Sequence, residues 1–144
     1  MGEQVICPEC GATLGTVPNC EAFFHEALAM EWVDPPRTAT AHHLLVATYM
    51  LQHPSRFTPE GQRALADLLI AVIDRNSSAQ ELRVLNRDLF DQENRDWRVV
   101  QETPAPPVLR RWQMTIASVL SGGPDELPKR IWRWARSTRA ELDG

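Results

Sequence analysis

Two cysteines near the start of the chain constrain its fold more than any other feature of the sequence. The run Cys7-Pro8-Glu9-Cys10-Gly11 separates two thiols by two residues, a spacing at which both thiolates can hold one tetrahedral ion. Gly11 can adopt the positive φ that such a knuckle often needs. The pattern predicts a zinc knuckle. A redox dithiol is the alternative, but it is typical of a βαβ context that this sequence lacks.

Proline and apolar spacing predict the fold class. Eleven prolines interrupt the 144 residues, and a proline cannot sit inside a helix because it lacks an N–H and clashes with the preceding turn. Between the prolines, apolar residues recur at helical rather than alternating spacing. We therefore predict an all-α fold of five to six helices. The length suits a single compact domain, with the zinc knuckle segment over residues 1–18 and a helical bundle over 19–144.

Capping residues locate the expected helices. Asn19 can cap a first helix over about 19–33, and Pro54 ends a second over about 40–53. Thr58-Pro59 starts a third, whose apolar residues are Leu65, Leu68, Leu69, Val72 and Ile73. Ser78 and Glu81 have capping-box spacing before a fourth, with the stripe Leu82, Leu85, Leu89 and Phe90. Thr115 is expected to cap a short helix through Leu120. The last follows Pro128, with Ile131, Trp134, Ala135, Thr138 and Leu142 on one side.

The cysteine pair is half of a tetrahedral ligand set, and the helix geometry selects the other half. The candidates are Cys20, His25, His42, His43 and His53. If the first two helices form an antiparallel hairpin turning near Pro36, Cys20 and His53 lie at nearly equal distances from the turn, at the same end. His42 would lie about 16 Å along the axis from His53, and His25 about 140° around the helix from Cys20.

The predicted set is therefore Cys7, Cys10, Cys20 and His53 around one zinc ion. Three sulfurs and one imidazole leave no open coordination position, which indicates a structural site. Each of the last two residues has a simpler interpretation. Cys20 could be a small buried thiol, and His53 a helix C-terminal histidine favoured by the helix dipole.

A second polar site is expected at the other end of the hairpin. His42 should face the region of Met30 and Glu31, and a histidine beside a carboxylate can transfer protons or form half of a second metal site. A hydrogen-bonded structural pair is the alternative. His25 and His43 are interpreted as surface or boundary residues.

Charge is unevenly distributed along the chain. Residues 108–144 carry seven basic and four acidic residues, whereas the first 107 carry eight and fifteen. The last helix combines five cations with two tryptophans: Lys129, Arg130, Arg133, Arg136, Arg139, Trp132 and Trp134. These residues could bind a phosphate or an acidic partner, or they could form the solvent-exposed face of the helix with no binding role. The overall net charge of -4 argues against a dedicated nucleic-acid or anionic-membrane binder.

The sequence also bears on location and enzyme class. No apolar run approaches the ~20 residues of a membrane span, and no basic and apolar leader opens the chain, so we expect a cytoplasmic protein. Phosphate loops, Gly-rich dinucleotide turns, nucleophile elbows and His-Glu-x-x-His motifs are absent from the sequence.

Several of these residues together resemble a known family. The Cys7-Pro8-x-Cys10-Gly11 run, Cys20, the His42-x-Leu44 motif and Gln52-His53-Pro54 resemble small bacterial proteins catalogued as domain of unknown function 5946. The resemblance implies that the three cysteines, His42 and His53 are signature positions, and it brings no assigned reaction. Asp67 departs from the family, since other members often carry a histidine at about that place.

Three functions remain open from the sequence. The first is a helical module with a structural zinc site that binds or scaffolds a protein or small molecule. The second is a zinc-dependent hydrolase, in which water replaces one ligand and His42 or Glu31 acts as a base. The third is recognition of nucleic acid or an acidic partner by the Arg/Trp helix.

Overall fold

The computed structural model describes residues 5–31, 39–76, 78, 80–81, 84, 103, 105–122 and 124–142. Within these ranges the chain forms five α-helices and two short 3₁₀ helices, and an isolated antiparallel bridge pairs Ile6 with Thr13. The all-α prediction is confirmed. No helix in this part of the chain is long and apolar enough to cross a bilayer.

The first two helices form the expected pair. Helix α1 covers Cys20–Glu31, and the Asn19 side chain caps it by accepting the Ala22 N–H at 3.0 Å. Helix α2 covers Ala39–Gln52, so that His53 lies just beyond its end and leads into the 3₁₀ helix η2, Pro54–Arg56. The end of the first predicted range, residues 32–33, falls outside the described residues, whereas α2 begins one residue before the predicted Thr40.

Helix α3 covers Pro59–Arg75, as its start signal predicts. The Thr58 hydroxyl accepts the Gly61 N–H at 3.0 Å, and the helix ends at Asn76, which adopts φ 53°. Beyond it, Ser78 and Glu81 form the predicted capping box, because each backbone N–H donates to the other side chain, at 3.3 and 3.1 Å. The apolar stripe Leu82, Leu85, Leu89 and Phe90 lies outside the described residues.

The C-terminal part contains two α-helices. Helix α6 covers Ile116–Val119, and the backbone N–H of its capping residue Thr115 donates to Ser118 Oγ at 3.1 Å. The 3₁₀ helix η3, Pro124–Glu126, leads directly into α7, Leu127–Leu142. The last helix thus starts one residue before Pro128, which its first turn accommodates because the N–H there needs no helical partner.

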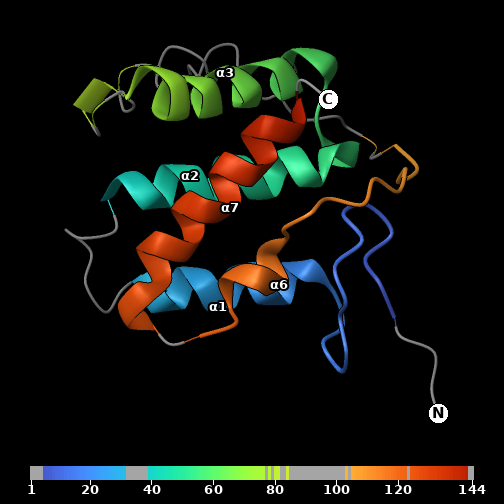
Figure 1. The fold of residues 1–144 in the computed structure, drawn as a ribbon. Coiled ribbons are helices and arrows are strands. Elements are labelled where there is room, and N and C mark those ends of the chain that lie inside the picture. Colours follow the sequence, from blue (N-terminus) through green and yellow to red (C-terminus); the bar gives the residue numbers. More distant parts are fainter. Residues whose placement is uncertain are drawn as a thin grey trace.

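The helices pack around α7. Figure 1 shows α7 crossing α2 and α1, with α3 on the far side of α2 and α6 beside α1. Side chains from α2, α3, α6 and α7 fill the core, including the fully buried Leu45, Leu69, Ile116, Ile131 and Trp134. The N-terminal segment lies at the end of the bundle where α1 begins and α2 ends (Figure 1).

A buried glutamine ties α2 to the C-terminal half. The Nε2 of Gln52 donates to the Met114 carbonyl at 2.9 Å and to Thr138 Oγ1 at 3.0 Å. The same carbonyl accepts the indole N–H of Trp134 at 3.2 Å. Because Gln52 is the last residue of α2, these bonds hold the end of that helix against α7, immediately before His53.

Candidate metal centre

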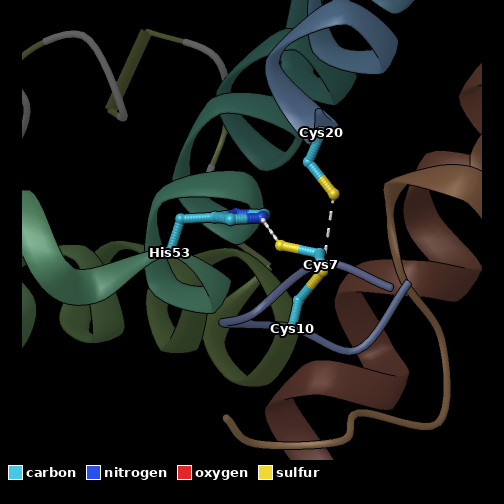
Figure 2. Close-up of side chains that lie close together, drawn as sticks. All are labelled: Cys7, Cys10, Cys20 and His53. Atoms are coloured by element: carbon cyan, nitrogen blue, oxygen red, sulfur yellow. Dashed lines mark hydrogen bonds between the residues drawn. The ribbon is translucent and has the colours of Figure 1, made fainter. Parts of the chain in front are cut away.

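A tight knuckle presents the first two cysteines. The Gly11 N–H donates to the Cys7 carbonyl at 3.1 Å, and the Cys7 N–H donates to the Ala12 carbonyl at 2.9 Å, so the chain reverses between the two thiols. Gly11 has φ +80°, the conformation that its place in the sequence predicts. Both thiol groups therefore lie on the same side of the turn, facing the bundle (Figure 2).

Four side chains from three segments of the chain converge at this turn. Cys20 comes from the start of α1 and His53 from the end of α2, and they join Cys7 and Cys10 (Figure 2). One ligand atom of each residue lies within 4.8 Å of all the others. The Cys7 sulfur is 3.6 Å from His53 Nε2, and the Cys10 and Cys20 sulfurs are also 3.6 Å apart.

These distances fit a tetrahedral ion and exclude a disulfide. All three cysteines are free thiols, since a disulfide would bring two sulfurs to about 2.05 Å. Around a zinc ion with Zn–S near 2.3 Å and Zn–N near 2.05 Å, tetrahedral geometry separates two sulfurs by about 3.8 Å and sulfur from nitrogen by about 3.6 Å. The two 3.6 Å separations are close to these edges, and all four donor atoms lie within 4.8 Å of one another, so the cluster is of a size that can hold one metal ion.

A hydrogen bond at Nδ1 orients the His53 ring so that Nε2 can coordinate a metal ion. His53 Nδ1 lies 2.7 Å from the Tyr49 carbonyl, to which it donates, and this leaves the Nε2 lone pair facing the sulfurs. The Tyr49 ring packs against the imidazole with centroids 4.3 Å apart, and it stacks on Phe24 of α1 at 4.2 Å. The imidazole is therefore held in position from two directions.

The members of the cluster differ in how tightly they hold a proton. Hydrogen bonds to Cys10, and to a smaller extent to Cys20, hold the pKa of the Cys7 thiol far below its usual value. Hydrogen bonds to Cys10 and Cys7 have the opposite effect on Cys20 and raise the pKa of its thiol. Burial disfavours the charged form of His53, but hydrogen bonds to Cys10 and Cys7 outweigh it and raise the pKa of His53 to about 10. A metal ion that binds here must displace the protons of Cys20 and His53, so its affinity falls as the pH is lowered.

The sequence of this chain matches a described protein family. Residues 5–143 match the family described as Family of unknown function (DUF5946). The chain belongs to this family. A comparison with curated proteins found no match, and neither did a comparison with solved structures. The resemblance drawn from the cysteine and histidine motifs is thereby confirmed, and it covers nearly the whole of this DUF5946 chain.

Side-chain and backbone contacts that sequence reasoning missed brace the knuckle of this DUF5946 protein. The Glu9 carboxylate accepts the Ser55 N–H at 3.0 Å, and the Glu9 carbonyl accepts the Arg110 N–H at 2.8 Å. Trp112 N–H points at the Cys10 carbonyl from 3.4 Å. Both of these N–H donors, Arg110 and Trp112, lie in the segment 105–112. Its contacts with the knuckle leave no sequence signal, because backbone groups make them.

A cleft of about 400 Å³ opens onto the cluster. Cys7, Cys20 and His53 line part of it, together with Tyr49 and Arg56. Cys10 is fully buried behind them. A small molecule such as a chelator can therefore approach the donor atoms from one side.

The second predicted polar pair also forms, at the other end of the hairpin. His42 Nδ1 and Glu31 Oε2 are 2.7 Å apart. The hydrogen bond to Glu31 raises the pKa of His42 above 6.5, although burial acts in the opposite direction. Glu31 Oε1 is buried with no hydrogen-bond partner among the described residues. His42 is eleven residues from His53 on α2, about 16 Å along the axis, so the pair lies apart from the cluster.

The two remaining histidines lie where the sequence suggests. His25 is largely exposed on α1 and lies 3.6 Å from Glu21 one turn before it. His43 is half-buried, with its ring 6.0 Å from that of His42. Neither belongs to the group of donor atoms around Cys10.

Proposed function

We propose that the cluster binds one zinc ion that stabilises the fold, and that the protein acts as a binding or scaffolding module. The observation that carries the proposal is the convergence of four donor atoms from three separate segments. The knuckle, the start of α1 and the end of α2 together place three buried thiols beside one imidazole. An ion would cross-link these segments, so its binding energy would contribute directly to folding.

Zinc is the cation that fits this donor set best. Thiolate sulfur and imidazole nitrogen in tetrahedral arrangement are typical of structural zinc sites, and four protein ligands leave no position for water. Thiolates also need a reducing compartment to stay available, which supports a cytoplasmic location. The hydrolase alternative has less support. Both groups offered as its base, His42 and Glu31, lie at the opposite end of the hairpin.

Metal analysis of the purified protein tests the zinc site. We expect one zinc per chain and a large fall in melting temperature when a strong chelator is added, because metal and folding are coupled. Thiol titration should find three reactive cysteines only after chelation. Protein purified without zinc, with a melting temperature that the chelator leaves unchanged, would refute the proposal.

Two histidine variants provide a matched comparison. His53→Ala removes a nitrogen that lies 3.6 Å from a cluster sulfur, so zinc occupancy should fall severalfold. His25→Ala removes an exposed histidine of the neighbouring helix and should leave occupancy unchanged. Equal occupancy in both variants would show that His53 is not a ligand.

Ligand counting separates the structural role from the catalytic one. X-ray absorption of the zinc-loaded protein should show three sulfur ligands and one nitrogen ligand. A set with a water oxygen in place of one of these would indicate an open position and favour the hydrolase.

A further inference from the structure

Helix α7 has one face in the core and one in solvent. Ile131, Trp134, Ala135 and Thr138 are buried, as the sequence pattern predicts. Lys129, Arg133 and Arg136 lie on the exposed side, and Trp132 is half-buried among them. Because these four residues follow one another at helical spacing, they form a single stripe, which we call the α7 stripe. It extends over about 10 Å of the helix.

The structure divides the five cations of the C-terminal helix into two groups. Arg130 Nε donates to the Val119 carbonyl at 2.5 Å, and Arg139 donates to the Asp74 carboxylate at 2.7 and 3.1 Å. Both arginines therefore link α7 to other parts of the chain. Within the described part of the chain, Lys129, Arg133 and Arg136 have no ion pair. The cations of the α7 stripe thus remain uncompensated by the acidic groups that this part of the chain offers.

The α7 stripe is hollowed as well as charged. A hollow of about 480 Å³ lies on it, lined by Pro128, Lys129, Trp132, Arg133 and Arg136. The guanidinium of Arg136 lies over the Trp132 ring, 5.2 Å from its centroid. An apolar floor of proline and tryptophan therefore lies among three cations, a combination that suits a ligand with both apolar and anionic groups.

We propose that the α7 stripe binds an acidic peptide segment of a partner protein, with carboxylates at the three cations and an apolar side chain on Trp132. Arginine suits carboxylates because its planar fork can make two parallel hydrogen bonds. The inference gives the binding module of the preceding section a surface and a partner, and in that sense it rests on the proposed function. The α7 stripe shares no lining residue with the cleft at the metal cluster.

Charge and stacking favour a peptide over nucleic acid. The chain has a net charge of -4, which repels a dense polyanion, whereas nucleic-acid binders usually present a broad basic surface. Arg136 lies over the Trp132 ring, and a flat base needs more open ring face for stacking than an aliphatic side chain needs for contact. A peptide needs only a few carboxylates and one apolar group, and the α7 stripe offers sites for both.

A labelled peptide tests the inference on the metal-loaded full chain. The probe is a short fluorescein-labelled peptide of alternating glutamate and leucine, and its binding is followed by fluorescence anisotropy. We expect saturable binding that weakens at least about tenfold in the double variant Arg133→Gln, Arg136→Gln. Both side chains are exposed and glutamine is a good helix former, so the variant should fold normally.

The control removes the same charge elsewhere. Arg63 and Arg75 are exposed on α3, and the double variant Arg63→Gln, Arg75→Gln changes the net charge equally. Affinity in this control should change less than about twofold. Equal losses in the two double variants would overturn the proposal, because they would show that only the overall charge matters.

Three further outcomes separate the α7 proposal from the metal proposal and a peptide ligand from nucleic acid. No binding by protein that carries its full zinc would overturn the α7 proposal and leave the metal proposal standing. Peptide binding by protein that never contains zinc would support the α7 stripe and refute the metal site. An oligonucleotide of thymidine that binds more tightly than the peptide, with the same loss in the α7 variant, would replace the peptide by single-stranded nucleic acid.

Discussion

Replacing Gln52 by methionine should destabilise the protein by about 2 kcal/mol, although the side chain touches neither the metal cluster nor solvent. Gln52 is fully buried, and its Nε2 donates to Met114 O and Thr138 Oγ1. A neutral hydrogen bond contributes about 1 kcal/mol net, so the two together contribute about 2. Methionine has nearly the same length, so packing should change little.

Two smaller effects act in opposite directions. The variant leaves the buried Thr138 hydroxyl without its donor, which adds to the cost. It also removes Gln52 Oε1, a buried oxygen with no partner among the described residues, and this offsets part of the loss of stability. The Met114 carbonyl keeps the indole N–H of Trp134. We therefore expect a value between about 1 and 3 kcal/mol, equivalent to a fall in melting temperature of roughly 4 to 12 °C for a chain of this size.

Urea unfolding at fixed zinc concentration measures the effect. The control is Gln113→Met, which makes the same chemical change at an exposed position and should alter stability by less than about 0.5 kcal/mol. A double-mutant cycle then isolates the long-range bond. Because Gln52→Met and Thr138→Val each break the same hydrogen bond, the double variant should be more stable than the sum of the single effects predicts, by about 1 kcal/mol. Strict additivity would refute the account.

Three further predictions concern the knuckle and the second polar pair. Gly11→Ala should cost about 1–2 kcal/mol in thermal unfolding, because φ +80° is unfavourable for alanine, and an unchanged melting temperature would contradict this. Glu9→Ala should speed zinc loss to a chelator, because the carboxylate that accepts the Ser55 N–H is removed. Glu9→Gln should speed the loss less, because the amide oxygen of glutamine can still accept that N–H. The pKa of His42 is raised by Glu31, so the pair stabilises the fold fully below about pH 6.5 and loses this contribution as the pH rises through the folded pKa. In an NMR titration Glu31→Gln should bring the pKa of His42 down, and no change would exclude the pairing.

Local patterns predicted the helices well. The caps at Asn19, Thr58 and Ser78 all form between residues three positions apart, so the residues that decide each cap lie close together in the sequence. The meeting of Cys20 and His53 was also predictable, because the fixed rise of a helix converts a sequence position into a distance along the axis. The interpretation of His53 as an isolated helix-end histidine does not agree with its position beside Cys7.

The sequence by itself determined the helix starts, the donor types and the end of the hairpin where the donors meet. Only the tertiary structure decided that Arg110 and Trp112 brace the knuckle and that Tyr49 orients His53. It also decided that Arg130 and Arg139 bond to other parts of the chain, whereas Arg133 and Arg136 face solvent. Those contacts were not predicted. Most join segments that are distant in sequence, and some use backbone groups that every residue carries, so they depend on how the helices pack and leave no mark in local spacing.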